Sequence, residues 1–210
     1  MKHKKINSIK FIYFDVGGVL MRWKELLIKI ADEHQMPYEE VEKVFLKYDS
    51  SACKGEISSQ ELWERMKKDL KLKKSAITDF FNVSVHTFTP IPETHLLIEK
   101  VIKHYSVGIL TNIYRDVYEK CVEKGHIPNL SYHKVIQSCE LGMAKPDAKI
   151  YQYAQLHAQV DANSILYIDD DRDNIKTATT LGWNTIMFNT NNPKKSVKEI
   201  ERYLNIYSSC

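Results

Sequence analysis

Residues 11–18 read Phe-Ile-Tyr-Phe-Asp-Val-Gly-Gly, an apolar run that ends in an acid and two glycines. A short run that is apolar at every residue predicts a strand buried on both faces, as in the middle of a parallel sheet. Glycines directly after such a run indicate a loop. We therefore predict a buried parallel strand over residues 11–16, with Asp15 at its carboxyl end.

The pattern of the chain changes near residue 89. Between residues 20 and 88 apolar residues recur at helical spacing, and Ser58 with Glu61 forms a capping box that opens one helix. After residue 90, short apolar runs alternate with helical segments. The further strands are expected at 106–110, within 135–141, at 165–168 and at 185–188.

This alternation predicts an α/β fold, with a Rossmann-like parallel sheet that carries helices on both faces. The helical block interrupts the loop after the first strand, so we interpret it as an inserted helical-bundle cap domain. We predict a core domain made of residues 1–19 and 89–210, and a cap domain made of residues 20–88.

The composition excludes several classes of protein. The chain has 210 residues, of which 43% are hydrophobic, too many for a disordered protein. Its 30 basic and 27 acidic residues are too evenly balanced to indicate a nucleic-acid partner. No apolar run approaches the roughly 18 residues of a membrane span, and the stretch after the basic N-terminus breaks at Asp15, so we expect no membrane partner and no signal peptide. The 4 cysteines include no Cys-x-x-Cys pair, which favours reduced thiols in a cytoplasmic protein.

Polar side chains follow several of the expected strands. They are, in chain order, Asp15, Thr111, Asn112, Lys145, Asp169 and Asp170. Each has an ordinary alternative, since an Asp can cap a helix, Thr-Asn suits a turn and a lone Lys is mostly solvated. Taken together they predict one site, because the carboxyl ends of parallel strands share the edge of the sheet where ligands bind.

The order of these residues resembles the haloacid dehalogenase-like superfamily of hydrolases. The matching motifs are Phe-Asp-Val-Gly-Gly-Val, Leu-Thr-Asn, Lys-Pro and Ile-Asp-Asp-Asp-Arg-Asp-Asn, at residues 14–19, 110–112, 145–146 and 168–174. Each motif alone is weak, but the four in this order are specific. Segments 53–58, 140–147 and 169–174 are similar to the branch of capped sugar-phosphate phosphatases that includes the bacterial α-D-glucose-1-phosphate phosphatase.

The resemblance implies an Mg²⁺-dependent phosphatase that acts on a small phosphorylated metabolite, such as a sugar phosphate. Asp15 would attack phosphorus as the nucleophile and form an aspartyl-phosphate. Asp15, Asp170 and the backbone carbonyl of Gly17 would hold the Mg²⁺, whose preferred ligands are oxygen atoms. The activity expected from the resemblance is therefore that of a phosphoric monoester hydrolase.

The resemblance also implies roles for the remaining motif residues. Thr111 and Asn112 would bind the phosphoryl oxygens, and Lys145 would neutralise negative charge beside the nucleophile and the transferring group. Asp169 and Asn174 would fill the other positions of the acidic motif and orient the metal ligands. The run of three Asp residues leaves Asp173 as an alternative to Asn174.

Gly17 departs from the common pattern of the superfamily. Many of its phosphatases carry there a second Asp, which protonates the leaving group and then activates water, and such catalysis contributes about 10²–10⁴-fold. The similar glucose-1-phosphate phosphatases also have Gly at this position. Three alternatives stay open: a good leaving group, a substitute acid, or a non-catalytic regulatory protein that binds a phosphorylated ligand.

A dehalogenase-like carbon hydrolase is another alternative on the same scaffold. The dehalogenases of the superfamily also lack the second Asp, and they attack carbon without a metal. They usually carry Ser or Asn in place of the acidic pair, so Asp169 and Asp170 argue against this alternative.

The predicted cap would close over the site and exclude water. By resemblance, the loop around Gly55 reaches toward the substrate, which makes Lys54 and Glu56 candidate substrate contacts, and Arg22 and Trp23 are further candidates. A helical cap leaves room for a small metabolite and disfavours a folded phosphoprotein. The oligomeric state is left open by these patterns.

Overall fold

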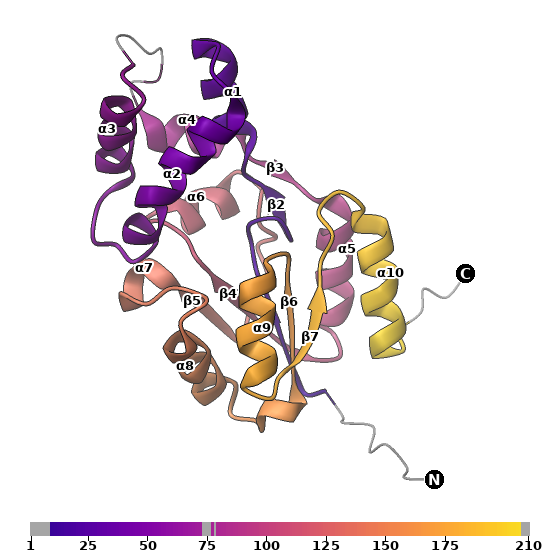
Figure 1. Cartoon of the computed structure of the whole chain (residues 1–210). Helices are drawn as coiled ribbons and strands as arrows, with labels where there is room; N and C mark the ends of the chain where they lie inside the picture. The colour runs from indigo at the N-terminus through magenta and orange to yellow at the C-terminus, as the bar shows by residue number, and fades with distance from the viewer. Residues whose placement is uncertain (1–8, 73–76, 78, 207–210) are drawn as a thin grey trace.

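The computed structural model describes residues 9–72, 77 and 79–206, and these residues form a parallel sheet of five strands (Figure 1). The strand order is β5, β4, β1, β6, β7. The strands are β1 (Phe11–Phe14), β4 (Ser106–Thr111), β5 (Lys134–Gln137), β6 (Ile165–Asp169) and β7 (Asn184–Met187). The central β1 pairs in parallel with β4 on one side and β6 on the other. The predicted α/β class with a Rossmann-like sheet is therefore confirmed.

Helices cover both faces of the sheet because successive side chains of a strand point to opposite faces. Ile12 and Phe14 of β1 pack in one hydrophobic cluster, while Phe11 and Tyr13 pack in another. The first cluster is completed by α5 (Pro92–Val101), α6 (Val117–Glu123) and α10 (Pro193–Leu204). The second is completed by α8 (Ala148–Ala158) and α9 (Arg172–Thr180), and the short η1 (Ala162–Ser164) precedes β6.

Two strands end earlier than the expected stretch by two residues or more, and the other three differ from it by one residue at one or both ends. The first strand ends at Phe14, although the backbone amide of Asp15 still donates to the carbonyl oxygen of Ile168 at 3.0 Å. Within 135–141, the strand stops at Gln137, and Ser138–Leu141 form the short helix α7. Residues 135–141 read Val-Ile-Gln-Ser-Cys-Glu-Leu, a stretch too short for periodicity to locate the change from strand to helix.

The helical block folds around a hydrophobic cluster of its own. It consists of α1 (Glu25–His34), α2 (Tyr38–Cys53), α3 (Ser59–Asp69) and α4 (Phe80–Thr87). An antiparallel pair of short strands, β2 (Met21–Arg22) and β3 (Thr89–Pro90), joins the block to the sheet at both of its ends. Side chains of Leu26, Val41, Trp63 and Phe80 form part of its buried cluster. We call the helices α1–α4 the cap, and the predicted division at residues 19/20 and 88/89 falls beside β2 and β3.

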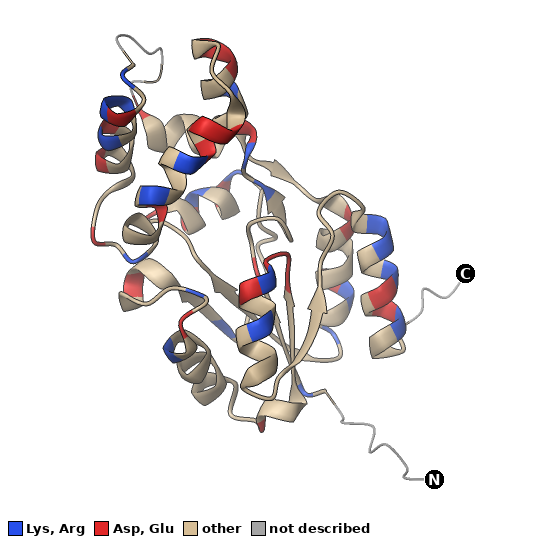
Figure 2. Cartoon of the chain, in the orientation of Figure 1, with Lys and Arg blue, Asp and Glu red and all other residues tan. Residues whose placement is uncertain are grey.

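Local signals explain where several elements begin. The Ser58 hydroxyl accepts a hydrogen bond from the backbone amide of Glu61 at 3.0 Å, so the predicted capping residue opens α3. Pro92 lies in the first turn of α5, where a missing amide hydrogen costs nothing. Lys and Arg alternate with Asp and Glu along the exposed helices (Figure 2). Among the described residues, no helix has the length and apolar character needed to cross a membrane.

Trp63 provides a test of the cap's separate hydrophobic cluster. The side chain is fully buried, stacks on Phe80 with ring centroids 5.5 Å apart, and donates from Nε1 to the carbonyl oxygen of Ile77 at 2.9 Å. We expect Trp63→Ala to lower the free energy of unfolding by about 3–5 kcal/mol, measured by urea denaturation. Leu156→Ala, at a side chain that is 72% exposed, is the control and should change it by about 0.5 kcal/mol or less. Equal effects of the two substitutions on the free energy of unfolding would contradict the placement of Trp63 in the buried cluster of the cap.

Candidate active site

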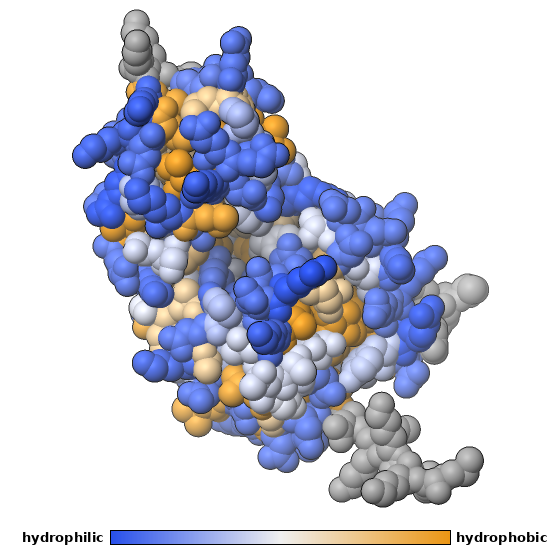
Figure 3. Space-filling view, in the orientation of Figure 1, coloured by the Kyte–Doolittle hydropathy of each residue, from blue (hydrophilic) through white to orange (hydrophobic). Residues whose placement is uncertain are grey.

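A cavity of about 480 Å³ lies between the carboxyl edge of the sheet and the cap. The sheet domain contributes Asp15, Thr111, Lys145 and Asp170 to its lining, and the cap contributes side chains that include Phe45. In Figure 3 the surface is hollowed where the cap meets the sheet domain. A more open depression of about 670 Å³ lies beside α8, and none of the predicted site residues lines it.

Lys145 lies at the centre of a buried ionic network at this edge. Its Nζ is 2.8 Å from Oδ1 of Asp15 and 2.8 Å from Oδ2 of Asp169, and 1% of its side chain is exposed. Burial opposes the positive charge, but the two carboxylates outweigh it and raise the pKa of Lys145 above its ordinary range. The ammonium group is therefore charged whenever the two carboxylates are.

Asp169 uses both of its carboxylate oxygens for contacts within the protein. The hydroxyl of Tyr167 donates to Oδ2, and the backbone amide of Asp171 donates to Oδ1 at 2.7 Å. The side-chain amide of Asn174 lies 3.2 Å from Oδ1 and 3.1 Å from Oδ2. Burial raises the pKa of Asp169, but Lys145 and these hydrogen bonds outweigh burial and lower it. These contacts fit a residue that orients its neighbours.

The structure also distinguishes Asn174 from Asp173. Asn174 is buried and contacts Asp169, whereas the side chain of Asp173 is exposed on the first turn of α9. Asp171 is the N-cap of α9, and its Oδ1 accepts hydrogen bonds from the backbone amides of Asp173 and Asn174. This N-cap sets the start of the helix and therefore the direction in which each of the two side chains points. Asn174 is thus the residue that faces the site.

Asp15 and Asp170 keep carboxylate oxygens available for a ligand. Asp15 receives its described hydrogen bond from Lys145, and Asp170 accepts a 3.2 Å bond from the hydroxyl of Thr190. Burial, and next the charge of Asp169, raise the pKa of Asp170 to about 6. Burial also raises the pKa of Asp15 to about 8, against the opposing effect of Lys145. Burial and the neighbouring carboxylates thus disfavour negative charge on both groups, and a bound cation would offset that.

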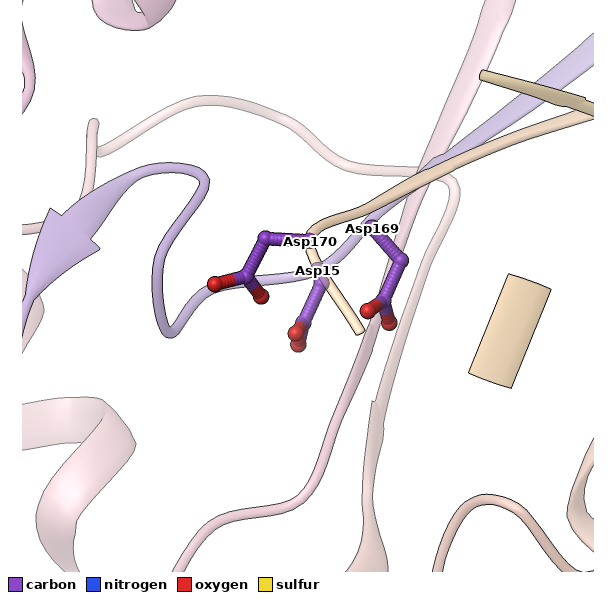
Figure 4. Close-up of side chains that lie close together, drawn as sticks. All are labelled: Asp15, Asp169 and Asp170. Atoms are coloured by element: carbon purple, nitrogen blue, oxygen red, sulfur yellow. The ribbon is translucent and has the colours of Figure 1, made fainter. Parts of the chain in front are cut away.

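A divalent cation fits this place. One carboxylate oxygen from each of Asp15, Asp169 and Asp170 lies within 4.8 Å of the others (Figure 4), and such oxygens are the ligands that hard cations prefer. Acidic residues also mark the carboxyl end of β6 in Figure 2. Gly17 lines the same cavity, and the use of its carbonyl oxygen as a further ligand stays a prediction.

The loop after β1 approaches Asp170 closely at Gly18. This residue has a φ of +77°, in the left-handed region that favours glycine, and a Cβ atom built on it would lie 2.0 Å from Oδ2 of Asp170. Any side chain at Gly18 would therefore displace the carboxylate. The second glycine of the opening motif thus lets the loop after β1 pass close to the Asp170 carboxylate.

Thr111 and Asn112 lie at the end of β4 and line the cavity. Thr111 is buried with 1% exposure. Asn112 is paired with the backbone of Lys145: its Nδ2 donates to the carbonyl oxygen at 2.9 Å, and its Oδ1 accepts from the amide at 2.8 Å. Asn112 thus fixes the loop that carries Lys145, and phosphoryl binding by the two residues stays a prediction.

Trp23 occupies the space beside Gly17. A Cβ atom built on Gly17 would lie 3.1 Å from Cδ1 and 3.3 Å from Nε1 of the Trp23 indole. Trp23 also lines the cavity and packs on Phe45, with ring centroids 5.6 Å apart. The indole therefore faces the cavity where a side chain at position 17 would otherwise point.

Lys54, Glu56 and Arg22 are not among the described residues that line the cavity. Lys54 ends α2, and the exposed Glu56 lines a separate depression of about 450 Å³. The guanidinium of Arg22 donates to the carbonyl oxygen of Thr190 at 3.4 Å. Gly55, between Lys54 and Glu56, has a φ of +71° and packs closely on α7: a Cβ atom there would lie 2.7 Å from the carbonyl oxygen of Cys139.

Three residues at the site were not singled out from the sequence. Thr190 donates to the carbonyl oxygen of Gly18 at 2.6 Å and also contacts Asp170, and its loop carries no pattern that indicates this. Tyr114 and Asp49 line the cavity and bond to each other at 2.5 Å. Asp49 had a usable signal, because it follows the buried Phe45 by one helical repeat.

Comparisons with known proteins agree with the fold and the motifs. Mouse acyl-CoA dehydrogenase family member 10 is 23% identical over an alignment of 214 positions, which covers 96% of this chain but 20% of that protein. The glyceraldehyde 3-phosphate phosphatase of Methanocaldococcus jannaschii is 30% identical over an alignment of 124 positions, which covers 57% of this chain and 53% of that protein. The chain thus spans only part of the length of these relatives.

A crystal structure of a HAD family enzyme variant from Bacteroides thetaiotaomicron, in complex with magnesium and inorganic phosphate, has a TM-score of 0.68 and 25% identity. The likeness covers 87% of this chain and 95% of that one. The sequence model of haloacid dehalogenase-like hydrolases matches residues 12–188, which is most of the chain. The four motifs, the parallel sheet and this match together place the protein in the family of haloacid dehalogenase-like hydrolases.

Proposed function

We propose that this protein is an Mg²⁺-dependent phosphatase of a small phosphorylated metabolite, with Asp15 as its nucleophile. The observation that carries the proposal is the buried network of Asp15, Lys145 and Asp169. This network lies beside Asp170 at the wall of the cavity between the sheet and the cap. A nucleophile, a fixed cation and free metal-binding oxygens are the parts that phosphoryl transfer requires. The phosphate and magnesium in the Bacteroides structure support the same assignment.

Mg²⁺ fits the described donor set, because the residues with available oxygens are carboxylates. Asp15 and Asp170 would hold it, while Asp169 is already occupied by protein donors. The ion would supply positive charge that offsets the repulsion between a carboxylate nucleophile and a phosphate dianion.

The residues of the chain would share the work of transfer. A carboxylate oxygen of Asp15 attacks phosphorus, the bond to the leaving oxygen breaks, and an aspartyl-phosphate forms. The Lys145 ammonium, held by carboxylates at 2.8 Å, stays charged beside the nucleophile and stabilises the negative charge of the transferring group. Thr111, a buried residue that lines the cavity, would donate to a phosphoryl oxygen. Water then hydrolyses the aspartyl-phosphate and restores Asp15.

The size of the cavity supports a small substrate. Its volume of about 480 Å³ is roofed by the cap, which a folded phosphoprotein would have to displace. Its lining includes the apolar side chains of Phe45, Phe80 and Phe88 besides the ionic network, so a compact phosphate ester with a partly apolar surface fits it. The archaeal relative is named for a three-carbon sugar phosphate, which is consistent with this class.

Substitution of Asp15 tests the proposal directly. We expect Asp15→Asn to reduce phosphate release from 4-nitrophenyl phosphate by about 10⁴-fold or more, because the amide is a poor nucleophile. Asp173→Asn is the matched control, since it removes an exposed carboxylate from the neighbouring helix, and it should keep wild-type activity. Chloride release from 2-chloropropionate that resists EDTA would instead indicate the dehalogenase alternative. A phosphorylated Asp15 that is never hydrolysed would indicate the alternative of a non-catalytic regulatory protein.

The raised pKa values predict how Mg²⁺ binding depends on pH. Asp170, with a pKa of about 6, and Asp15, with a pKa of about 8, must lose protons before they bind a cation. Both pKa values lie above the ordinary Asp value of about 4 that holds in the unfolded chain. Without a cation, the free energy of unfolding therefore falls as pH rises from about 4 to about 8. We therefore expect Mg²⁺ to raise the Tm more at pH 8 than at pH 5, as measured by differential scanning fluorimetry. Asp170→Asn should abolish the increase, and Asp173→Asn should retain it.

A further inference from the structure

The leaving group of an ordinary metabolite ester is an alkoxide, which departs slowly unless it gains a proton. Gly17 offers no side chain to donate one, and the Trp23 indole fills the space beside it. A proton donor for this reaction must therefore come from another wall of the cavity. The described carboxylates that line the cavity are Asp15, Glu42, Asp49, Asp170 and Asp171.

Four of these carboxylates already have another role or accept hydrogen bonds that keep them ionised. Asp15 and Asp170 have roles as nucleophile and metal ligand in the proposed function. Asp171 caps α9 and accepts two backbone amides. Glu42 accepts from Nζ of Lys24 at 2.9 Å and from the hydroxyl of Tyr38 at 2.8 Å, which lower its pKa and keep it ionised. Asp49 of the cap is the carboxylate that remains.

Asp49 is held in place by contacts between the cap and the sheet domain. The hydroxyl of Tyr114, from the loop after β4, donates to its Oδ1 at 2.5 Å. The thiol of Cys53, one helical repeat further along α2, lies 3.7 Å from Oδ1 and 3.8 Å from Oδ2. The end of α2 is itself fixed, because the hydroxyl of Ser138 donates to the carbonyl oxygen of Cys53 at 2.5 Å. The carboxyl group is thus fixed at the wall of the cavity that contains Asp15.

The surroundings of Asp49 favour its protonated form. Burial raises its pKa, against the hydrogen bonds from Tyr114 and Cys53, which lower it. Burial also raises the pKa of the Tyr114 hydroxyl and of the Cys53 thiol, so both stay neutral donors. The other charged groups on the cavity wall are the Lys145 network, Asp170, Asp171 and the Lys24–Glu42 ion pair, and the described contacts of Asp49 include none of them.

We propose that Asp49 is the general acid and base of the reaction and replaces, from the cap, the side chain that Gly17 lacks. The inference rests on the proposed function, since it assigns the proton of that same phosphoryl transfer. In the first step, the P–O bond to the leaving group breaks and the leaving oxygen takes the proton of the Asp49 carboxyl group. In the second, water attacks the aspartyl-phosphate, Asp49 takes a proton of that water, and the bond between Asp15 and phosphorus breaks.

A series of aryl phosphates tests this role through the leaving group. Phenyl phosphate needs a proton on its leaving oxygen, whereas 2,4-dinitrophenyl phosphate needs none, so kcat/KM for the two esters separates proton donation from binding. We expect Asp49→Asn to lower kcat/KM by about 10²–10⁴-fold for phenyl phosphate and by less than tenfold for 2,4-dinitrophenyl phosphate. We also expect a burst of dinitrophenolate in the variant, because hydrolysis of the aspartyl-phosphate loses its base.

Glu40→Gln, which removes an exposed carboxylate from the same helix, is the control and should leave both kcat/KM values unchanged. Equal losses on the two esters, or no loss on either, would overturn the role of Asp49. A wild-type protein that hydrolyses neither ester would overturn the proposed function, and this role with it. Activity that is lost in Asp15→Asn but kept in Asp49→Asn would overturn the role of Asp49 alone.

Tyr114→Phe is a second test, and it applies even when Asp49→Asn does not fold. The variant removes a hydrogen bond that favours the ionised form of Asp49, so the pKa of Asp49 rises. An acid that works in its protonated form then stays active to higher pH. We expect the basic limb of the kcat/KM profile for phenyl phosphate to move to higher pH, with no such movement for the dinitrophenyl ester. An unchanged basic limb would refute proton donation by Asp49.

Discussion

The ammonium group of Lys145 lies buried between the carboxylates of Asp15 and Asp169, and the geometry of the site depends on that pairing. Removing one partner of such a buried ion pair costs about 3–5 kcal/mol, because a charge is left uncompensated. The pairing requires three separate parts of the chain to meet. Asp15 and Asp169 lie at the ends of the neighbouring strands β1 and β6, and Asn112 fixes the loop of Lys145 through its backbone. Asp170 adds a third carboxylate, so three carboxylates against one ammonium leave two excess negative charges, which explain why a cation fits here.

The sequence predicted the fold and the meeting of the strand-end residues for one physical reason. Parallel strands end at a common edge, so residues far apart in the chain converge there once the strands are recognised. The strands were recognisable because those buried on both faces are apolar, as β1 is throughout and β6 is up to Asp169. The choice between Asp173 and Asn174 needed the structure, since it depends on the phase of α9 from its N-cap.

The cap was predictable as a helical insertion, but its contacts with the site were not. Helical periodicity identifies which face of α2 is buried, yet it does not say what that face meets. Lys54 and Glu56 are not among the described residues that line the cavity, and Gly55 between them packs on the carbonyl oxygen of Cys139, a tertiary contact with no local pattern. Asp49 lies in the buried phase of the same helix, where a carboxylate needs a partner, and Tyr114 provides it from the sheet domain.

Gly17 and Trp23 place a constraint on where proton transfer can occur. The indole lies 3.1 Å from the position of a Cβ atom at residue 17, closer than such atoms ordinarily approach, so a side chain there would require the indole to shift. A donor on the sheet domain would be present whether the cap is open or closed. A donor on α2 reaches the leaving group only while Tyr114 and Ser138 hold the cap against the sheet domain. Proton transfer would then require the closed state, in which bulk water is also excluded, so unproductive hydrolysis in an open site is disfavoured.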